Sequence, residues 1–143
     1  SIAAGGRAQA GNRVAVQDRP LTLEVAVSAA ATRIEGFAHR NSKGFAGAMV
    51  VLVPKNLSLM ASLARRDQSD SDGSFALLNV VPGAYTVVAI EDGWEVDWGN
   101  PSVMARYLPG GVAVTVKDES DNGTPNGPGT VIRLPEPVTV QAR

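Results

Sequence analysis

Short runs of strand-favouring residues, separated by tight turns, extend through most of this 143-residue sequence. The hydrophobic residues, 44% of the chain, are mostly Val, Ala and Leu, and they are mixed with 15 Gly and 9 Pro. That mixture favours short strands joined by turns. No segment of more than about ten residues has apolar residues at the spacing of an amphipathic helix. The sequence therefore predicts an all-β fold. The turn signals lie at Asn41–Gly44, Asp70–Gly73, Val81–Gly83 and Leu108–Gly111.

Seven runs have the composition of strands, and an eighth follows them. Val138–Val140 comes after Pro135 and Pro137, so we expect an edge strand there, because proline is tolerated mainly at sheet edges. The best helical candidate is a single turn at Pro101–Tyr107, and residues 121–130 predict a loop or hairpin tip. The seven runs are Arg33–Ala38, Gly47–Val53, Ala61–Arg66, Ser74–Leu78, Ala84–Glu91, Val112–Lys117 and Thr130–Leu134.

The clearest alternation of all precedes these runs. Leu21, Leu23, Val25 and Val27 alternate with more polar or smaller residues, which is the period of a half-buried strand. Residues 1–20 allow either an N-terminal strand pair or a flexible arm. We therefore expect residues 1–30 to form an N-terminal arm or strand segment and residues 31–143 to form the main domain.

Composition argues against several classes of function. The formal net charge is −1 and the thirteen basic residues are scattered, so we expect no nucleic-acid partner. There is no Cys, which excludes disulfides and thiolate zinc sites, and we expect no cofactor. No apolar run approaches the roughly 18 to 20 residues that cross a bilayer, so we expect no membrane insertion. Because the sequence begins with Ser1, we expect a processed piece of a longer precursor, although an expression product would begin in the same way.

Four fragments occur in an order that resembles the carboxypeptidase-regulatory-like domains: Ile34–Gly36, Gly47–Pro54, Asp72–Phe75 and Val81–Thr86. The resemblance covers Thr32–Leu134. It implies a seven-stranded antiparallel Greek-key sandwich, prealbumin-like and related to the B repeats of collagen adhesins, with the N-terminal strand or arm as an addition. It also implies an extracellular, bacterial cell-surface or periplasmic location.

The continuation of the chain resembles a subgroup of terminal modules in bacterial surface proteins. The residues that carry this resemblance are Glu91–Trp94, Trp98–Pro101 and Tyr107–Leu108. In that subgroup the preceding segment resembles the tail of another β-domain. The resemblance therefore implies that residues 1–30 are the remnant of a preceding domain.

The polar residues do not form a catalytic pattern. His39 is the single histidine, and no Ser lies in a Gly-x-Ser-x-Gly context. The carboxylates around Glu91 lie in a polar loop, where burial cannot raise the pKa that a glycosidase acid requires. We expect no enzyme. Asp70 and Asp72 resemble the start of a calcium loop, but the turn lacks a later bidentate Glu, so a plain hairpin turn is favoured over a metal site.

The remaining candidate is a group of aromatic residues. Trp94, Trp98 and Tyr107, with Asn100 among them, could stack on sugar rings and bind their hydroxyls, or could fold back and seal one end of the domain. The sealing role is favoured.

These observations leave two functions. The first is a non-catalytic structural module that builds a surface filament by strand addition through Leu21, Leu23, Val25 and Val27, with copies of itself or neighbouring surface-protein domains as partners. The alternative is a carbohydrate-binding module that holds a polysaccharide through Trp94, Trp98, Asn100 and Tyr107.

Overall fold

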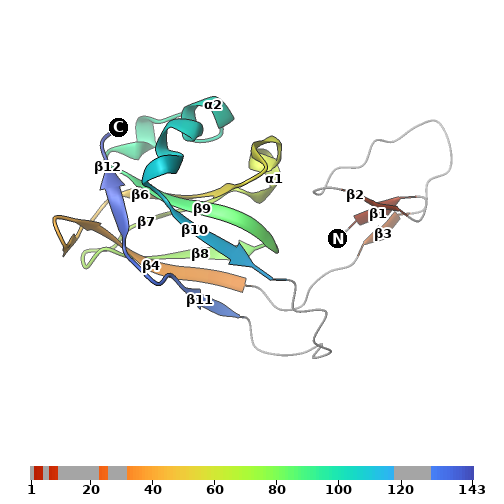
Figure 1. The fold of residues 1–143 in the computed structure, drawn as a ribbon, viewed down its shortest axis with the longest axis horizontal. Coiled ribbons are helices and arrows are strands. Elements are labelled where there is room, and N and C mark those ends of the chain that lie inside the picture. Colours follow the sequence, from red (N-terminus) through yellow and green to blue (C-terminus); the bar gives the residue numbers. More distant parts are fainter. Residues whose placement is uncertain (1, 5–6, 10–22, 26–31, 118–129) are drawn as a thin grey trace.

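The computed structural model describes residues 2–4, 7–9, 23–25, 32–117 and 130–143. About half of residues 32–117 and 130–143 form a mixed sheet of nine strands (Figure 1). The structure is thus mostly β-strand, which confirms the coarse part of the all-β prediction, although helical segments are also present. The nine strands are β4 (Thr32–Arg40), β5 (Lys43–Gly44), β6 (Met49–Pro54), β7 (Arg65–Gln68), β8 (Ser74–Val80), β9 (Gly83–Ile90), β10 (Val112–Val116), β11 (Val131–Arg133) and β12 (Val138–Gln141).

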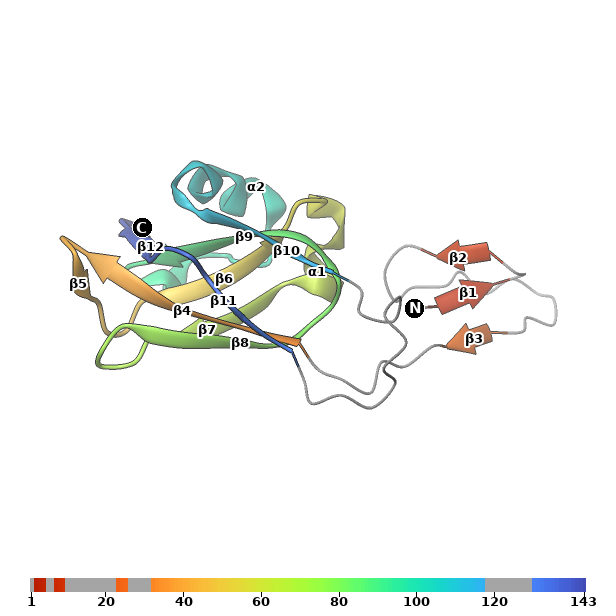
Figure 2. The same cartoon turned by 60° about the horizontal axis from the view of Figure 1, so that its bottom comes forward.

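The sheet curls so that two halves face each other (Figure 2). In one half, β4 pairs with β8 on one side and with β11 on the other. In the second half, β9 pairs with β6 and β10, and β7 follows β6 at the edge. Strand β12 joins the halves, because it pairs with Ala38 and His39 of β4 and then with Ala89 and Ile90 of β9.

The predicted antiparallel sandwich of seven strands is wrong in strand number and direction. Strands β11 and β12 both run parallel to β4, and β12 also runs parallel to β9. The reason lies in Pro135 and Pro137, which interrupt the chain between β11 and β12. Proline has no N–H to donate to a ladder, so one long strand becomes two short ones with different neighbours.

Alternating residues of facing strands fill the space between the two halves. Ile34 of β4 and Leu77 of β8 are fully buried there, opposite Leu52 of β6 and Val87 of β9. Each of these strands presents every second side chain to this core, as strand geometry requires. Burial of such aliphatic side chains contributes about 1.5–3 kcal/mol each.

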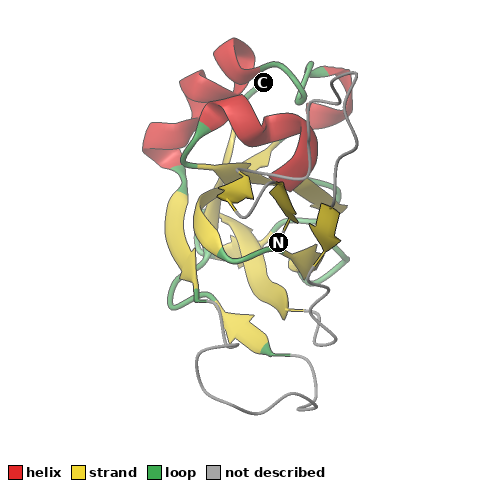
Figure 3. Cartoon of the chain, turned by 90° about the vertical axis from the view of Figure 1, so that its right-hand side faces the viewer, coloured by secondary structure: helices red, strands yellow, loops and turns green. Residues whose placement is uncertain are grey.

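A second core covers the other face of β6 and β9. All six residues of β6 are buried, because Met49, Val51 and Val53 face helical segments instead of solvent. Met104 and Tyr107 pack on them from those segments, which gather at one face of the molecule (Figure 3). The helical segments are η1 (Leu57–Leu59), α1 (Met60–Leu63), η2 (Gly93–Glu95), α2 (Pro101–Met104) and η3 (Ala105–Gly110).

The structure changes one of the local predictions and confirms another. The run Ala61–Arg66, predicted as a strand, is divided between α1 and β7. A helical turn forms there because Met60 is buried in the second core, with Leu57 packed against the same core. The helical turn predicted at Pro101–Tyr107 is confirmed, with Pro101 at the start of α2.

The described N-terminal residues form a separate three-stranded antiparallel sheet. Its order is β2 (Arg7–Gln9), β1 (Ile2–Ala4), β3 (Leu23–Val25). In β3, Leu23 lies opposite Ala4 and Val25 lies opposite Ile2. Of the predicted assembly strand, Leu21 and Val27 lie outside the described residues.

Candidate functional site

Arg66 of β7 lies over both tryptophan rings. Its guanidinium carbon is 5.2 Å from the ring centroid of Trp94 and 4.8 Å from that of Trp98. Trp94 is 48% exposed, whereas Trp98 packs partly buried against the second core. A guanidinium over an indole face is attracted by the negative ring face. Arg66 therefore ties the loop that carries both indoles to β7.

The other two residues of the predicted sugar site have structural contacts. Tyr107 is only 5% exposed and belongs to the second core. The Asn100 side chain accepts a hydrogen bond from the Ser102 N–H at 3.0 Å and so caps α2. The structure thus brings Trp94 and Trp98 together on the surface, but it does not bring Tyr107 to them as an exposed ring.

Arg66 belongs to this aromatic group in the structure, but it was not among the site residues predicted from the sequence. Its role depends on a contact between β7 and a loop almost thirty residues further along the chain. The general preference of Arg for aromatic faces was the one available signal, and it does not identify which Arg.

The predicted calcium candidates lie in a hairpin turn. The Asp70 carbonyl accepts from the Gly73 N–H at 2.9 Å, and Gly73 has a φ of +87°. The Asp72 carboxylate accepts from the Ser74 hydroxyl at 2.6 Å and from the Ser74 N–H at 2.9 Å. These hydrogen bonds hold the pKa of Asp72 below its usual value. The carboxylate therefore stabilises the turn itself.

The acidic loop after β9 also makes ion pairs. Arg40 donates to the Glu91 carboxylate at 2.7 Å, and this hydrogen bond holds the pKa of Glu91 below its usual value. A general acid requires the opposite shift. Glu95 pairs with Arg143. His39 lies on β4 beside Phe37, with ring centroids 6.1 Å apart. Among residues 32–117 and 130–143, no three His, Asp or Glu side chains are grouped to hold a metal ion.

A groove of about 440 Å³ opens at the end of β6 and the start of β9. Leu59, Leu63 and Tyr85 line it, together with Lys55. The Tyr85 hydroxyl donates to the Val81 carbonyl, and burial raises the pKa of Tyr85. The lining is mainly apolar. Lys55 is its one charged residue, and no carboxylate lines the groove.

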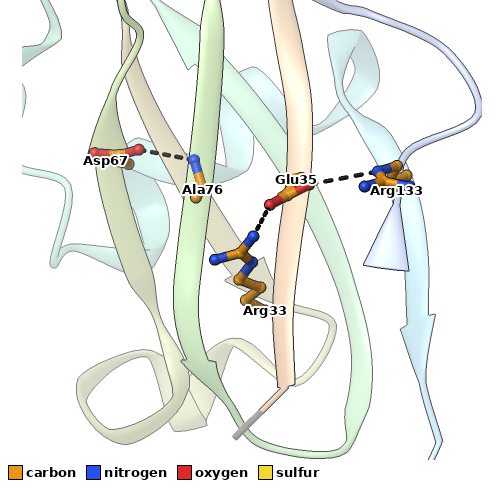
Figure 4. A network of polar contacts seen from close by, with 5 residues as sticks. All are labelled: Arg33, Glu35, Asp67, Ala76 and Arg133. Atoms are coloured by element: carbon orange, nitrogen blue, oxygen red, sulfur yellow. Dashed lines mark hydrogen bonds and ion pairs between the residues drawn. The ribbon is translucent and has the colours of Figure 1, made fainter. Parts of the chain in front are cut away.

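Two polar networks stabilise the outside of the curled sheet (Figure 4). On β4, Glu35 pairs with Arg33 of the same strand and with Arg133 of β11 at 3.5 Å. The Asp67 carboxylate of β7 accepts a hydrogen bond from the Ala76 N–H of β8 at 2.8 Å. Three hydrophobic side chains on the same strands are exposed: Phe37 of β4, Leu78 of β8 and Val131 of β11.

Within the described part of the chain, no helix has the length and apolarity of a membrane span. No protein-family model matches the chain, and no curated protein is significantly similar to it.

A solved structure, the dioxygenase domain of a dioxygenase carbohydrate-binding protein fusion from the cellulolytic bacterium Streptomyces sp. SirexAA-E, shows a weak similarity. It is 13% identical, with a TM-score of 0.37 over 83% of this chain and 84% of that chain. At that TM-score the similarity supports no conclusion about fold or chemistry.

Proposed function

We propose that this chain is a non-catalytic structural module of a bacterial exterior that assembles with its own kind by strand addition through its N-terminal segment. The resemblance to carboxypeptidase-regulatory-like domains is part of this proposal, as is the extracellular or periplasmic location. The observation that carries it is the position of β3. This strand lies at the edge of the three-stranded sheet, and no second strand of the described residues pairs with it.

The polar side chains support a structural role. Arg40 and Glu91 join the ends of β4 and β9, Asp67 joins β7 to β8, and Asp72 stabilises a turn. Each of these groups has a partner within the fold and a contact that explains its position. An edge strand with alternating apolar residues, by contrast, can extend into a sheet formed with another chain.

The test compares two variants of the full chain by size-exclusion chromatography with light scattering. Leu23→Lys with Val25→Lys places two charges on the apolar positions of the strand, so we expect it to shift the size distribution toward smaller species. Glu24→Lys is the control, since it changes the alternate position and should leave the size distribution unchanged. Identical distributions for both variants and the unmodified chain would refute the assembly proposal.

The alternative, carbohydrate binding, is favoured by one observation: Trp94 presents about half of its surface beside Trp98. A ring in that position can stack on a sugar. Trp94→Ala should reduce retention on an immobilised polysaccharide and lower the melting temperature only slightly, because Trp98 keeps its contact with Arg66. Leu78→Ala, another exposed apolar residue remote in sequence, is the control. Absence of retention for the unmodified protein on glucans and host glycans would refute this alternative.

A further inference from the structure

Strand β10 has an open edge. It pairs with β9 from Val112 opposite Val87 to Val116 opposite Gly83. Among the described residues, no strand pairs with the other side of β10. Its backbone groups on that side are therefore available to another strand.

The other edges of the sheet carry features that discourage pairing. Strand β7 consists of Arg65–Gln68 and so bears three charged side chains. The edge of β8 is blocked where Asp67 accepts from the Ala76 N–H. Strand β11 has three residues, includes Arg133 and is soon followed by proline. Charged residues, short length and proline are the usual means of protecting an edge.

Strand β10 has none of these features. Its five residues, Val112–Val116, are Val, Ala, Val, Thr and Val. Val112 and Val116 are buried, Val114 is partly buried at the rim of the first core, and Ala113 and Thr115 are exposed. The edge is thus small, uncharged and regular.

The hydrogen-bond pattern identifies the groups that point outward. Lys55 donates its N–H to the Ala84 carbonyl, so Ala84 directs its backbone toward the β6 side of β9. Backbone groups alternate along a strand, and Tyr85 therefore faces β10, where Val114 lies opposite it. By the same alternation, Ala113 and Thr115 direct their N–H and C=O groups to the open edge.

We propose that β10 pairs antiparallel with β10 of a second copy of this chain, about a two-fold axis at Val114. This register places each Ala113 opposite Thr115 of the other copy, which gives four backbone hydrogen bonds. In this register the outward-facing groups of both strands meet. The two β9–β10 ladders then form one continuous sheet.

The strand is complementary to itself in this register. Val112 lies opposite Val116 of the second copy, and the two Val114 side chains meet at the axis, where their partly exposed surface becomes buried. Lys117 lies opposite Gly111, so no like charges oppose each other. A two-fold contact of this kind uses the same surface on both subunits and closes as a dimer. This interface goes beyond the proposed function, because it does not involve the N-terminal segment.

The first test uses sedimentation equilibrium of the full chain. Ala113→Lys with Thr115→Lys places lysines opposite lysines, and we expect the dimer dissociation constant to rise at least about tenfold. Ala113→Lys with Thr115→Glu places opposite charges across the axis and should restore the dimer. The control is Ala61→Lys with Ala105→Lys, two exposed positions on helical segments, which should leave dimerisation unchanged.

The second test fixes the register with cysteines, since the chain contains none of its own. Ala113→Cys with Thr115→Cys should form a disulfide-linked dimer under mild oxidation, because opposed residues lie about 5.5 Å apart between Cα atoms. Ala113→Cys alone should not, because the two copies of that residue are separated by more than about 7 Å in this register.

A monomeric unmodified chain at every concentration would overturn the inference, as would equal cross-linking of the single and double cysteine variants. A dimer that is lost in Leu23→Lys with Val25→Lys but kept in Ala113→Lys with Thr115→Lys would also overturn it. That last result would leave the proposed function intact, so the two proposals can fail separately.

Discussion

The carboxylate of Asp67 accepts a hydrogen bond from the backbone N–H of Ala76 at 2.8 Å (Figure 4). Asp67 lies on β7, at one end of the strand order, and Ala76 lies on β8 in the opposite half of the curled sheet. No backbone ladder joins β7 to β8 within the described residues. This side-chain bond, together with the hydrogen bond that Arg65 of β7 donates to the Asn79 carbonyl of β8, therefore helps to hold the side of the sheet that β12 does not close.

Replacing Asp67 should loosen that side. Asp67→Ala leaves the half-buried Ala76 N–H without its acceptor, so we expect the free energy of unfolding to fall by about 1–3 kcal/mol. Urea titration measures the loss. Asp67→Asn retains an acceptor oxygen and should lose less, and the neighbouring exposed Gln68→Ala should be close to neutral. Equal effects of Asp67→Ala and Asp67→Asn would contradict the proposed role of the hydrogen bond.

The turn before β8 depends on a glycine. Gly73 has a φ of +87°, and a Cβ there would lie 2.5 Å from the Ala38 carbonyl oxygen. Both the backbone strain and the close contact make Gly73→Ala destabilising, by about 1–3 kcal/mol. Gly99→Ala is the matched control, because a Cβ at Gly99 would meet nothing within 4 Å. Thermal unfolding of the two variants should differ clearly; similar melting temperatures would show that the turn can relax.

The ion pair between Arg40 and Glu91 should make stability depend on pH. Its hydrogen bond lowers the pKa of Glu91 in the folded state, so the folded state binds this proton less readily than the unfolded state. The stabilisation is therefore present above the usual carboxyl pKa of about 4.3 and is lost as the pH falls through the lower folded value.

Urea midpoints measured between neutral and acidic pH can detect this dependence. The difference between the unmodified chain and Glu91→Gln should shrink as the pH falls. The control is Glu136→Gln, an exposed carboxylate between β11 and β12, for which the difference should stay constant. A constant difference for Glu91→Gln as well would show that the pair does not contribute.

The second core should be as important as the first. Met104 is fully buried between α2 and the outer face of β6 and β9. Met104→Ala creates a cavity there, and we expect a loss of about 2–5 kcal/mol in the free energy of unfolding. Ser102→Ala, at an exposed position of the same helix, should be nearly neutral. A loss below about 1 kcal/mol would mean that the helical layer adds little to the fold.

The second core is also the part of the fold that sequence reasoning did not find. The runs that formed strands were identified from local composition, because residues such as those of β4 and β9 alternate or are rich in Val. In β6, every residue is buried, which a local pattern cannot distinguish from a strand between two sheets. The helical layer above it is built from segments of three to six residues, too short to show a period.

Strand direction was equally hidden. The sequence indicated an edge strand after Pro137, but β12 lies between β4 and β9 and runs parallel to both. That pairing depends on contacts between residues about 50 and 100 positions apart, not on local residues. At the candidate site, the two tryptophans were identified from residue type, whereas the burial of Tyr107 and the contact of Arg66 follow from packing. Residue type therefore predicts where the chain turns, whereas tertiary contacts decide which neighbours a strand pairs with and which side chains are buried.

The position of β12 has a mechanical consequence. Because β12 runs parallel to β4, a pull on Thr32 in one direction and on Gln141 in the other drags the two strands past each other along their length. The backbone hydrogen bonds between them lie across that pull, so they bear the load together instead of opening one after another. We therefore expect the domain to resist tension applied between Thr32 and Gln141 more strongly than a geometry in which the strands peel apart.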